Sequence, residues 1–211
     1  MSDLPGGQWG PALVGHQWPG SSALAVLSAA AASRHAVGTS FQSYADVLRS
    51  VFHTVLADQE GAAAENIRAC FRGGEEHARA VAERNAAKRV ALDCAHRRVS
   101  ELRSALTEIA ERGSSQIRSI IAGADPAQAK VARIREVVLA AQTDADAHAA
   151  MCMQEVYGSI QGVLDTCGPA NSARQFAHTH GVGPHSLHSA PHPDEVDRHV
   201  REAIEAAVTP P

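Results

Sequence analysis

The sequence predicts an all-α protein, an elongated antiparallel three-helix bundle or coiled coil of long helices, and two observations lead to this fold class. First, apolar residues recur at alternating intervals of three and four over most of residues 21–166, which is the spacing of a heptad seam. Second, the chain of 211 residues is 45% apolar but only 4% aromatic, and much of the apolar share is alanine. Alanine has the highest helix propensity and lets helices approach closely. Long helices packed side by side are therefore favoured over a globular core.

The first helix is expected at about residues 21–57. Ser21 and Ser22 are suitable N-caps directly after Pro19-Gly20. Gly61, in the stretch "ADQEGAAAEN", interrupts the pattern and predicts a turn. The predicted seam of this helix consists of Val37, Phe41, Tyr44, Leu48, Val51 and Val55.

The second helix is expected at about residues 62–122, as one helix on the order of 90 Å long. A strict 4-3 register runs from Ile67 through Phe71 to Ile120 without an interrupting proline. Gly73-Gly74 and Gly113 are its weak points, because glycine lowers helix propensity. Asn85 and Lys88 dilute the seam and are expected to mark the place where the packing partner changes.

The third helix is expected at about residues 126–166. Asp125 is the predicted N-cap, Pro126 the first helical residue, and Gly168-Pro169 the stop. Because the turns are short, neighbouring helices must be antiparallel. The first helix is predicted to pack on the N-terminal half of the second, and the third on its C-terminal half. The predicted stripe of the third helix is Val131, Ile134, Val138, Ala141, Ala145, His148 and Cys152.

The flanking segments are expected to be less ordered. Residues 1–20 are predicted to be a flexible Gly/Pro leader that holds both tryptophans, Trp9 and Trp18. Trp18 either folds back on a helix as a hydrophobic staple or contacts a partner, whereas Trp9 is expected to be disordered or bound only in a complex. Residues 169–193 read as a flexible His/Pro-rich linker, and residues 194–208 as a short amphipathic helix, too short to be stable alone.

No constellation predicts catalysis, and no cofactor is expected. His148 and Cys152 have the spacing of a base and a nucleophile on one helix face, but both lie on the predicted core stripe, so packing is the preferred interpretation. No metal ligands are predicted, because the histidine-rich segment lacks a rigid scaffold. The alternative metal site that the pattern leaves open consists of His178, His180, His185 and His188.

Charge and cysteine usage give few positive indications. The formal net charge of −4 indicates neither nucleic-acid nor membrane-surface binding. The basic interval from Arg84 to Arg103 is interleaved with acids and is expected to form a solvated, ion-paired face. Without a C-x-x-C motif, the four cysteines are expected to be buried free thiols, with cross-helix disulfides left open if the protein is exported. They are Cys70, Cys94, Cys152 and Cys167.

No targeting or membrane segment is expected. The apolar run "ALAVLSAAAAS" is preceded by no lysine or arginine, which argues against a signal peptide. This run is also too short to span a bilayer.

The tryptophan-proline-glycine opening, the alanine-rich first helix, the turn "DQEGAAAE" and the long second helix resemble the W-x-G helical-hairpin proteins of ESX (type VII) secretion systems in mycobacteria and relatives. Residues 117–150 also resemble a mycobacterial helical domain family without assigned activity, often found in ESX-associated proteins. Two departures matter. Trp18-Pro19-Gly20 precedes the first helix instead of occupying the turn between the helices. Neither tyrosine is followed four residues later by an acidic residue, as the export signal of the family requires; the residues found there are Leu48 and Gln161.

The resemblance implies a non-enzymatic, ESX-associated exported interaction module or N-terminal targeting domain. It would be secreted or cell-surface by a signal-peptide-independent route, and would bind a protein partner, or itself, through helix packing. Two alternatives stay open: the targeting part of a toxin or enzyme whose catalytic domain lies beyond residue 211, and a cytoplasmic helical scaffold or chaperone. The candidate partner contacts are Trp18, Gly20, Gly61, Phe41 and Phe71.

Overall fold

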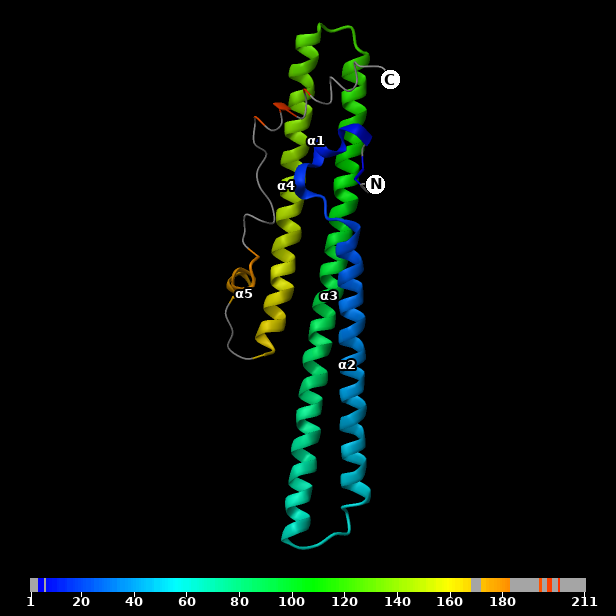
Figure 1. Cartoon of the computed structure of the whole chain (residues 1–211), viewed down its shortest axis with the longest axis vertical. Coiled ribbons are helices and arrows are strands. Elements are labelled where there is room, and N and C mark those ends of the chain that lie inside the picture. The colour runs from blue at the N-terminus through cyan, green and yellow to red at the C-terminus, as the bar shows by residue number, and fades with distance from the viewer. Residues whose placement is uncertain are drawn as a thin grey trace. The chain divides into compact units, whose positions relative to one another are not determined.

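The computed structural model describes residues 4–5, 7–167 and 172–182, together with residues 194, 197, 198 and 201. It confirms the all-α fold class, since every regular element in these residues is helical (Figure 1). A 3₁₀ turn η1 (Gly7–Trp9), helix α1 (Gly10–Val14) and a second 3₁₀ turn η2 (Gly15–Gln17) precede the long helices. The remaining elements are α2 (Ser21–Thr54), α3 (Ala62–Ala122), α4 (Ala127–Asp165) and α5 (Ala173–Thr179).

The long second helix is confirmed as one unbroken element, with Gly73, Gly74 and Gly113 all inside α3. The first helix ends at Thr54, three residues before the expected end, and α4 begins and ends within one residue of expectation. Pro126 therefore occupies the position directly before the first helical residue, where Asp125 was expected. Its carbonyl accepts the backbone N–H of Lys130 at 3.1 Å.

The chain divides into two compact units, which are described separately. The hairpin unit comprises Ala25–His96 and Gly158–Ala173, and the core unit comprises residues 1–24, 97–157 and 174–211, in each case as far as these residues are described. The hairpin unit thus takes most of α2 with the first part of α3. The core unit takes the leader, the second part of α3 and most of α4.

In the hairpin unit, α2 and the first part of α3 run side by side and antiparallel (Figure 1). Small residues set how closely they approach. A Cβ atom added at Gly38 would lie 3.5 Å from the Ala82 carbonyl oxygen, and one added at Gly74 would lie 3.2 Å from Leu48 Cδ1. The fully or nearly buried residues of this seam are mostly alanines, including Ala31, Ala45, Ala64, Ala78 and Ala82. The packing of the first helix on the N-terminal half of the second is therefore confirmed.

The predicted seam of α2 was wrong in part. Phe41 and Leu48 are half-buried as expected, but Tyr44 is 55% exposed and Val55 63% exposed. Ala45 is fully buried in their place. Counting large apolar residues places the seam about one residue too early, because the close approach at Gly38 selects small side chains for the contact.

The turn between α2 and α3 is held by one arginine that the sequence pattern did not indicate. The Arg68 guanidinium donates to the Leu56 carbonyl from Nε at 3.1 Å and from Nη2 at 2.9 Å, and also reaches the Gln59 carbonyl. Gly61 has φ +98°, a left-handed conformation that favours glycine. The predicted turn at Gly61 is therefore confirmed.

The leader corrects the expectation of a flexible segment. In the core unit, residues 7–17 form short helical turns, and Trp9, Leu13 and Val14 are buried. Trp9 is only 3% exposed, so its expected disorder was wrong as well. The leader orders because its apolar side chains pack into the buried cluster that α3 and α4 form.

The segment after α4 also differs from expectation. Residues 173–179, expected within a flexible linker, form α5, in which Ala173 and Ala177 are buried. The rest of the predicted linker from residue 183 onward lies outside the described residues. So does most of the predicted helix 194–208, of which only Asp194, Asp197, Arg198 and Arg201 are described, all as helical.

Asn85 supplies a test of the hairpin seam. Its side chain is 6% exposed; Nδ2 donates to the Val81 carbonyl at 2.9 Å, while Oδ1 has no hydrogen-bond partner among the described residues. We expect Asn85→Ala to raise the free energy of unfolding by about 1–2 kcal/mol, because it removes a buried unpaired acceptor and adds helix propensity. Urea unfolding followed by circular dichroism measures this change. The exposed Asn66→Ala in the same helix is the control for propensity alone, and an equal gain in both variants would contradict the buried-acceptor explanation.

Candidate functional site

The leader lies in a socket formed by α3 and α4 of the core unit. Leu13 is fully buried and packs directly over Gly113: a Cβ atom at Gly113 would lie 2.5 Å from Leu13 Cδ2 and 3.0 Å from Cδ1. Only a residue without a side chain leaves room for this contact. The buried cluster around it consists of Trp9, Ala12, Leu13, Val14, Leu106, Ile109, Ala110, Ile117, Ile120, Ile134, Val138, Ala141 and Ala145. The packing of the third helix on the C-terminal half of the second is therefore confirmed.

Side chains of α4 bind the leader by hydrogen bonds. Gln142, which is buried, donates from Nε2 to the Ala12 carbonyl at 2.6 Å. At the next turn, Gln17 donates from Nε2 to Asp146 Oδ1 at 3.3 Å. The Gln142 side chain binds a backbone carbonyl of the leader. This hydrogen bond therefore fixes the position of α1 in the socket without selecting a particular side chain.

Trp18 packs on α3 through an arginine. The Arg103 guanidinium carbon lies 4.3 Å from the centre of the Trp18 ring, a cation–π geometry. The same guanidinium donates from Nη1 to the Pro19 carbonyl at 2.5 Å. Trp18 is partly buried against the cluster, so its contacts here are those expected of a staple on a neighbouring helix.

The other four candidate contact residues, Gly20, Gly61, Phe41 and Phe71, lie outside the leader socket. Gly20 is exposed directly before α2, and Gly61 lies in the turn between α2 and α3. Phe41 and Phe71 are half-buried, on α2 and α3 respectively. Each of these positions is explained by packing or turn geometry within its own unit.

A surface that the sequence analysis did not separate from the seam lies on α2. Val26, Val37, Tyr44, Val47 and Val51, here called the outer stripe, recur at intervals of 11, 7, 3 and 4 residues, which return to one helix face. Val26 is 66% exposed and Val47 58% exposed. The heptad intervals that join Val37, Tyr44 and Val51 can be found in the sequence. The prediction, however, placed these residues in the same seam as Phe41 and Leu48.

The geometry of His148 and Cys152 does not favour nucleophilic chemistry. His148 is exposed rather than on the core stripe, where it was expected. Burial raises the pKa of the Cys152 thiol, the Glu155 carboxylate raises it further, and Arg98 opposes the rise. Activated cysteines have a lowered pKa, so this shift points away from a nucleophile.

None of the four cysteines is in a disulfide. Cys70 and Cys167 are exposed, which corrects the expectation that all four are buried, while Cys94 and Cys152 are half-buried.

The histidine segment is described only in its first part. His178 lies in the last turn of α5, and the His180 ring lies 4.4 Å from that of Phe176. His185 and His188 lie outside the described residues. Within the described ranges, no group of three or more His, Cys, Asp or Glu residues is arranged to hold a metal ion.

The predicted ion pairing of the basic interval of α3 is confirmed for Arg89 and Arg98, whereas Arg103 instead contacts the Trp18 ring and the Pro19 carbonyl. Arg89 contacts Asp93 at 3.5 Å, and Arg98 contacts Glu101 at 2.8 Å and also reaches Glu155 on α4. The guanidinium groups of Arg89 and Arg98 are therefore paired with carboxylates of α3 or α4.

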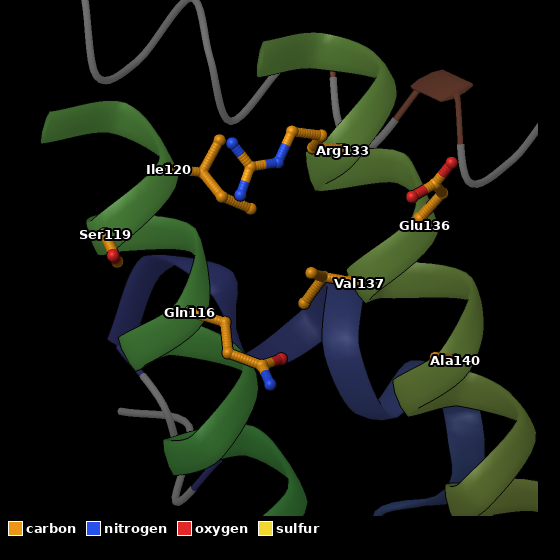
Figure 2. Close-up of a pocket in the computed structure, with 7 residues that line it drawn as sticks. All are labelled: Gln116, Ser119, Ile120, Arg133, Glu136, Val137 and Ala140. Carbon is orange, nitrogen blue, oxygen red and sulfur yellow. The ribbon is translucent and has the colours of Figure 1, made fainter. Parts of the chain in front are cut away.

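A hollow of about 450 Å³ lies between the end of α3 and the start of α4 in the core unit (Figure 2). Arg133 at its rim donates to Asp125 at 2.5 Å. Its lining offers no nucleophile with an adjacent base, which catalysis by acyl transfer would need. The lining residues are Gln116, Ser119, Ile120, Arg133, Glu136, Val137 and Ala140.

The described residues define an all-α protein built from long helices packed against one another. Among known proteins, the chain is similar to the "Uncharacterized protein Rv2082" of Mycobacterium tuberculosis (strain ATCC 25618 / H37Rv), with 32% identity over 181 residues. This match covers 85% of the chain and 24% of the relative, so the chain spans about a quarter of the relative's length. No protein-family model matches the chain, and no solved structure matches it. None of the helices in the described part is long and apolar enough to cross a membrane.

Two glycines of α3 form a matched pair for testing the socket. A Cβ atom at Gly73 meets nothing within 4 Å, whereas one at Gly113 meets the buried Leu13. Gly73→Ala is expected to stabilise the chain by roughly 0.5–1 kcal/mol through helix propensity. Gly113→Ala is expected to be less stable than Gly73→Ala by about 1–3 kcal/mol, because the socket becomes overpacked. Thermal unfolding followed by circular dichroism compares them, and equal stabilisation by both substitutions would contradict the Leu13–Gly113 contact.

Thiol reactivity tests the environment of Cys152. Because only the thiolate reacts and the pKa of Cys152 is raised, its alkylation by iodoacetamide should be slower than that of the exposed Cys70 and Cys167 and should need a higher pH. Peptide mass mapping of the alkylated chain over a pH series gives the rate at each site. A Cys152 that reacts first at neutral pH would reopen the nucleophile hypothesis.

Proposed function

We propose that the chain is a non-enzymatic helical interaction module associated with ESX (type VII) secretion, exported without a signal peptide. The observation that carries the interaction part is the outer stripe of α2. Five valine and tyrosine side chains line one face of this helix, and Val26, Tyr44 and Val47 among them are more than half exposed. Exposed apolar side chains gathered on one face of a helix are typical of protein–protein contacts.

The hairpin unit has a physical reason to bind a partner. Its buried residues are mainly alanines, and among the described residues of this unit Leu56 is the one larger apolar side chain that is buried. Burial contributes about 25 cal/mol per Å² of apolar surface, so an alanine seam contributes little per residue. Covering the outer stripe would add the larger valine and tyrosine surfaces to the buried area.

The chemistry of the partner follows from the charges of α2. In 34 residues this helix carries only Arg34, Asp46 and Arg49 as formally charged side chains. Arg49 pairs with Glu75 of α3 at 2.8 Å. The outer stripe is therefore an apolar, nearly uncharged face, which favours an apolar helix as the partner over a nucleic acid or a charged membrane surface.

The secretion part of the proposal depends on the resemblance. The Trp18-Pro19-Gly20 opening, the glycine turn at Gly61 and residues 117–150 supply it, and the relative in Mycobacterium tuberculosis is consistent with a mycobacterial setting. The raised pKa of Cys152 and the exposed position of His148 support the non-enzymatic part.

A second candidate function is the targeting part of a longer toxin or enzyme. The observation that favours it is the length of the relative, of which the matched region is 24%. In this case the helices described here would bind the export machinery or a chaperone, and a separate domain would carry the activity. Sequencing the reading frame past the codon for Pro211 tests this candidate, since an immediate stop codon would exclude it.

Fractionation separates the exported module from a cytoplasmic scaffold or chaperone. The chain should be recovered from the culture filtrate of a mycobacterial host with a functional ESX system and should stay in the lysate of a host without one. Recovery from the lysate of both hosts would contradict the secretion proposal and leave the scaffold.

The outer stripe itself is tested by a charge substitution. Val47→Glu places a carboxylate in the centre of the stripe, and Ser50→Glu places one on an exposed part of the same helix, outside both the stripe and the seam. We expect Val47→Glu to reduce the amount of partner-bound chain at least tenfold, because a buried unpaired charge strongly disfavours association, while Ser50→Glu leaves it unchanged. Native size-exclusion of cell extracts, with circular dichroism to verify folding, measures both. Wild-type complexes with Val47→Glu would contradict a role for the stripe.

A further inference from the structure

We propose that the socket between α3 and α4 is a peptide-binding site that takes the leader of a second copy of this chain, so that two copies exchange residues 4–18. The inference rests on the leader contacts alone and holds whether or not the protein is exported. It identifies a surface on the core unit and a ligand of defined chemistry: one short helical turn with Trp9, Leu13 and Val14 as buried anchors.

The socket has the features of a built binding site. Gly113 leaves the hollow that Leu13 fills, and Gln142, itself more than nine-tenths buried, donates to the Ala12 backbone at 2.6 Å. These two groups come from different helices, α3 and α4; Gly113 is 100 positions from Leu13 in the chain, and Gln142 is 130 positions from Ala12. The socket therefore recognises the leader through space, as it would a separate peptide.

The leader has the features of a ligand. Its helix α1 has five residues, far too few to be stable in water without a packing partner. The anchors Trp9, at the end of η1, and Leu13 and Val14, in α1, are all buried in the socket. The leader therefore folds on the socket, and the same side chains are available to any socket that it reaches.

The connection between leader and α2 permits exchange. Only Trp18, Pro19 and Gly20 separate the last leader turn from Ser21. Trp18 is extended, with φ −72° and ψ 111°, and a Cβ atom at Gly20 would meet only Ser22 Oγ, at 3.7 Å. Rotation at Gly20 would redirect the leader at the cost of its own socket contacts and of the Arg103 contacts to Trp18 and the Pro19 carbonyl, and an exchanged leader would form the socket contacts again on the second copy. Exchange of an identical element through such a short hinge is a low-cost route to a dimer. Because docking within one chain profits from a high effective concentration, exchange is favoured when copies are brought together at high local concentration.

Two complementary full-length variants test the proposal. Leu13→Asp damages the leader and leaves the socket intact, whereas Gly113→Leu fills the socket and leaves the leader intact. Each variant alone should be monomeric, with undocked leaders. Mixed, they should form a one-to-one heterodimer in which the leader of the Gly113→Leu chain occupies the socket of the Leu13→Asp chain. Sedimentation velocity measures the dimer. The emission of the two tryptophans, both in the leader, should shift to the blue on mixing. A mixture that stays monomeric with unshifted emission would overturn the proposal.

A second measurement uses the wild-type chain and does not depend on the folding of the variants. A fluorescently labelled peptide of residues 4–19 is titrated with the full chain, and its anisotropy is followed. We expect saturable binding, weakened at least tenfold when the peptide carries Leu13→Asp. Equal binding of the two peptides would show that the socket does not recognise a leader from outside its own chain. The same titration with the Leu13→Asp chain, whose own leader does not compete, must show tighter binding of the wild-type peptide, and no binding to that chain would overturn the proposal.

Discussion

The contact between Leu13 and Gly113 is the constraint on which the core unit depends. The buried residues that α3 and α4 contribute to this core include Leu106, Ile109, Ile117, Ile120, Ile134 and Val138. Trp9, Leu13 and Val14 complete the same cluster from a segment of irregular composition. The glycine in α3 is not a defect in a long helix, because its missing side chain is the space that the leader fills. The two tryptophans lie at the start of the chain because that segment, and not the helices, completes this core.

The hairpin unit is packed differently from the core unit, because its buried residues are mainly alanines. At Gly38 an added Cβ atom would lie 3.5 Å from the Ala82 carbonyl oxygen, and at Gly74 it would lie 3.2 Å from the Leu48 side chain, so α2 and α3 approach closely at these glycines. Close approach favours small side chains in the seam and displaces the valines and Tyr44 to the outer stripe. A surface suited to a further helix is thus a direct consequence of an alanine-rich seam. Arg68 compensates at the turn, where its guanidinium binds carbonyls that the end of α2 leaves without helical partners.

The sequence was sufficient for the helices and insufficient for the surfaces. Periodicity placed α3 correctly from end to end, and Gly61 was read correctly as a breaker, because these signals are local. The seam of α2 was misplaced, because apolar periodicity weights Tyr44 above Ala45 while the interhelical distance decides between them. The leader was missed for a related reason: a five-residue helix flanked by glycines has no periodicity, and its order comes entirely from residues 106–145. Nothing local to Gly113 distinguishes a socket from a weak point. The resemblance to ESX-associated hairpins suggested a biological setting but carried no information about these contacts.

The most direct test of this account is acrylamide quenching of tryptophan fluorescence in the native chain, since both tryptophans lie in the leader. If the leader is part of the core, the emission of Trp9, which is 3% exposed, should be protected from the quencher and lie to the blue of the emission of the unfolded chain. The quenching plot should then curve into an accessible and a protected fraction. A linear plot with the slope of the unfolded chain would mean that the leader is solvated and that α3 and α4 pack without it.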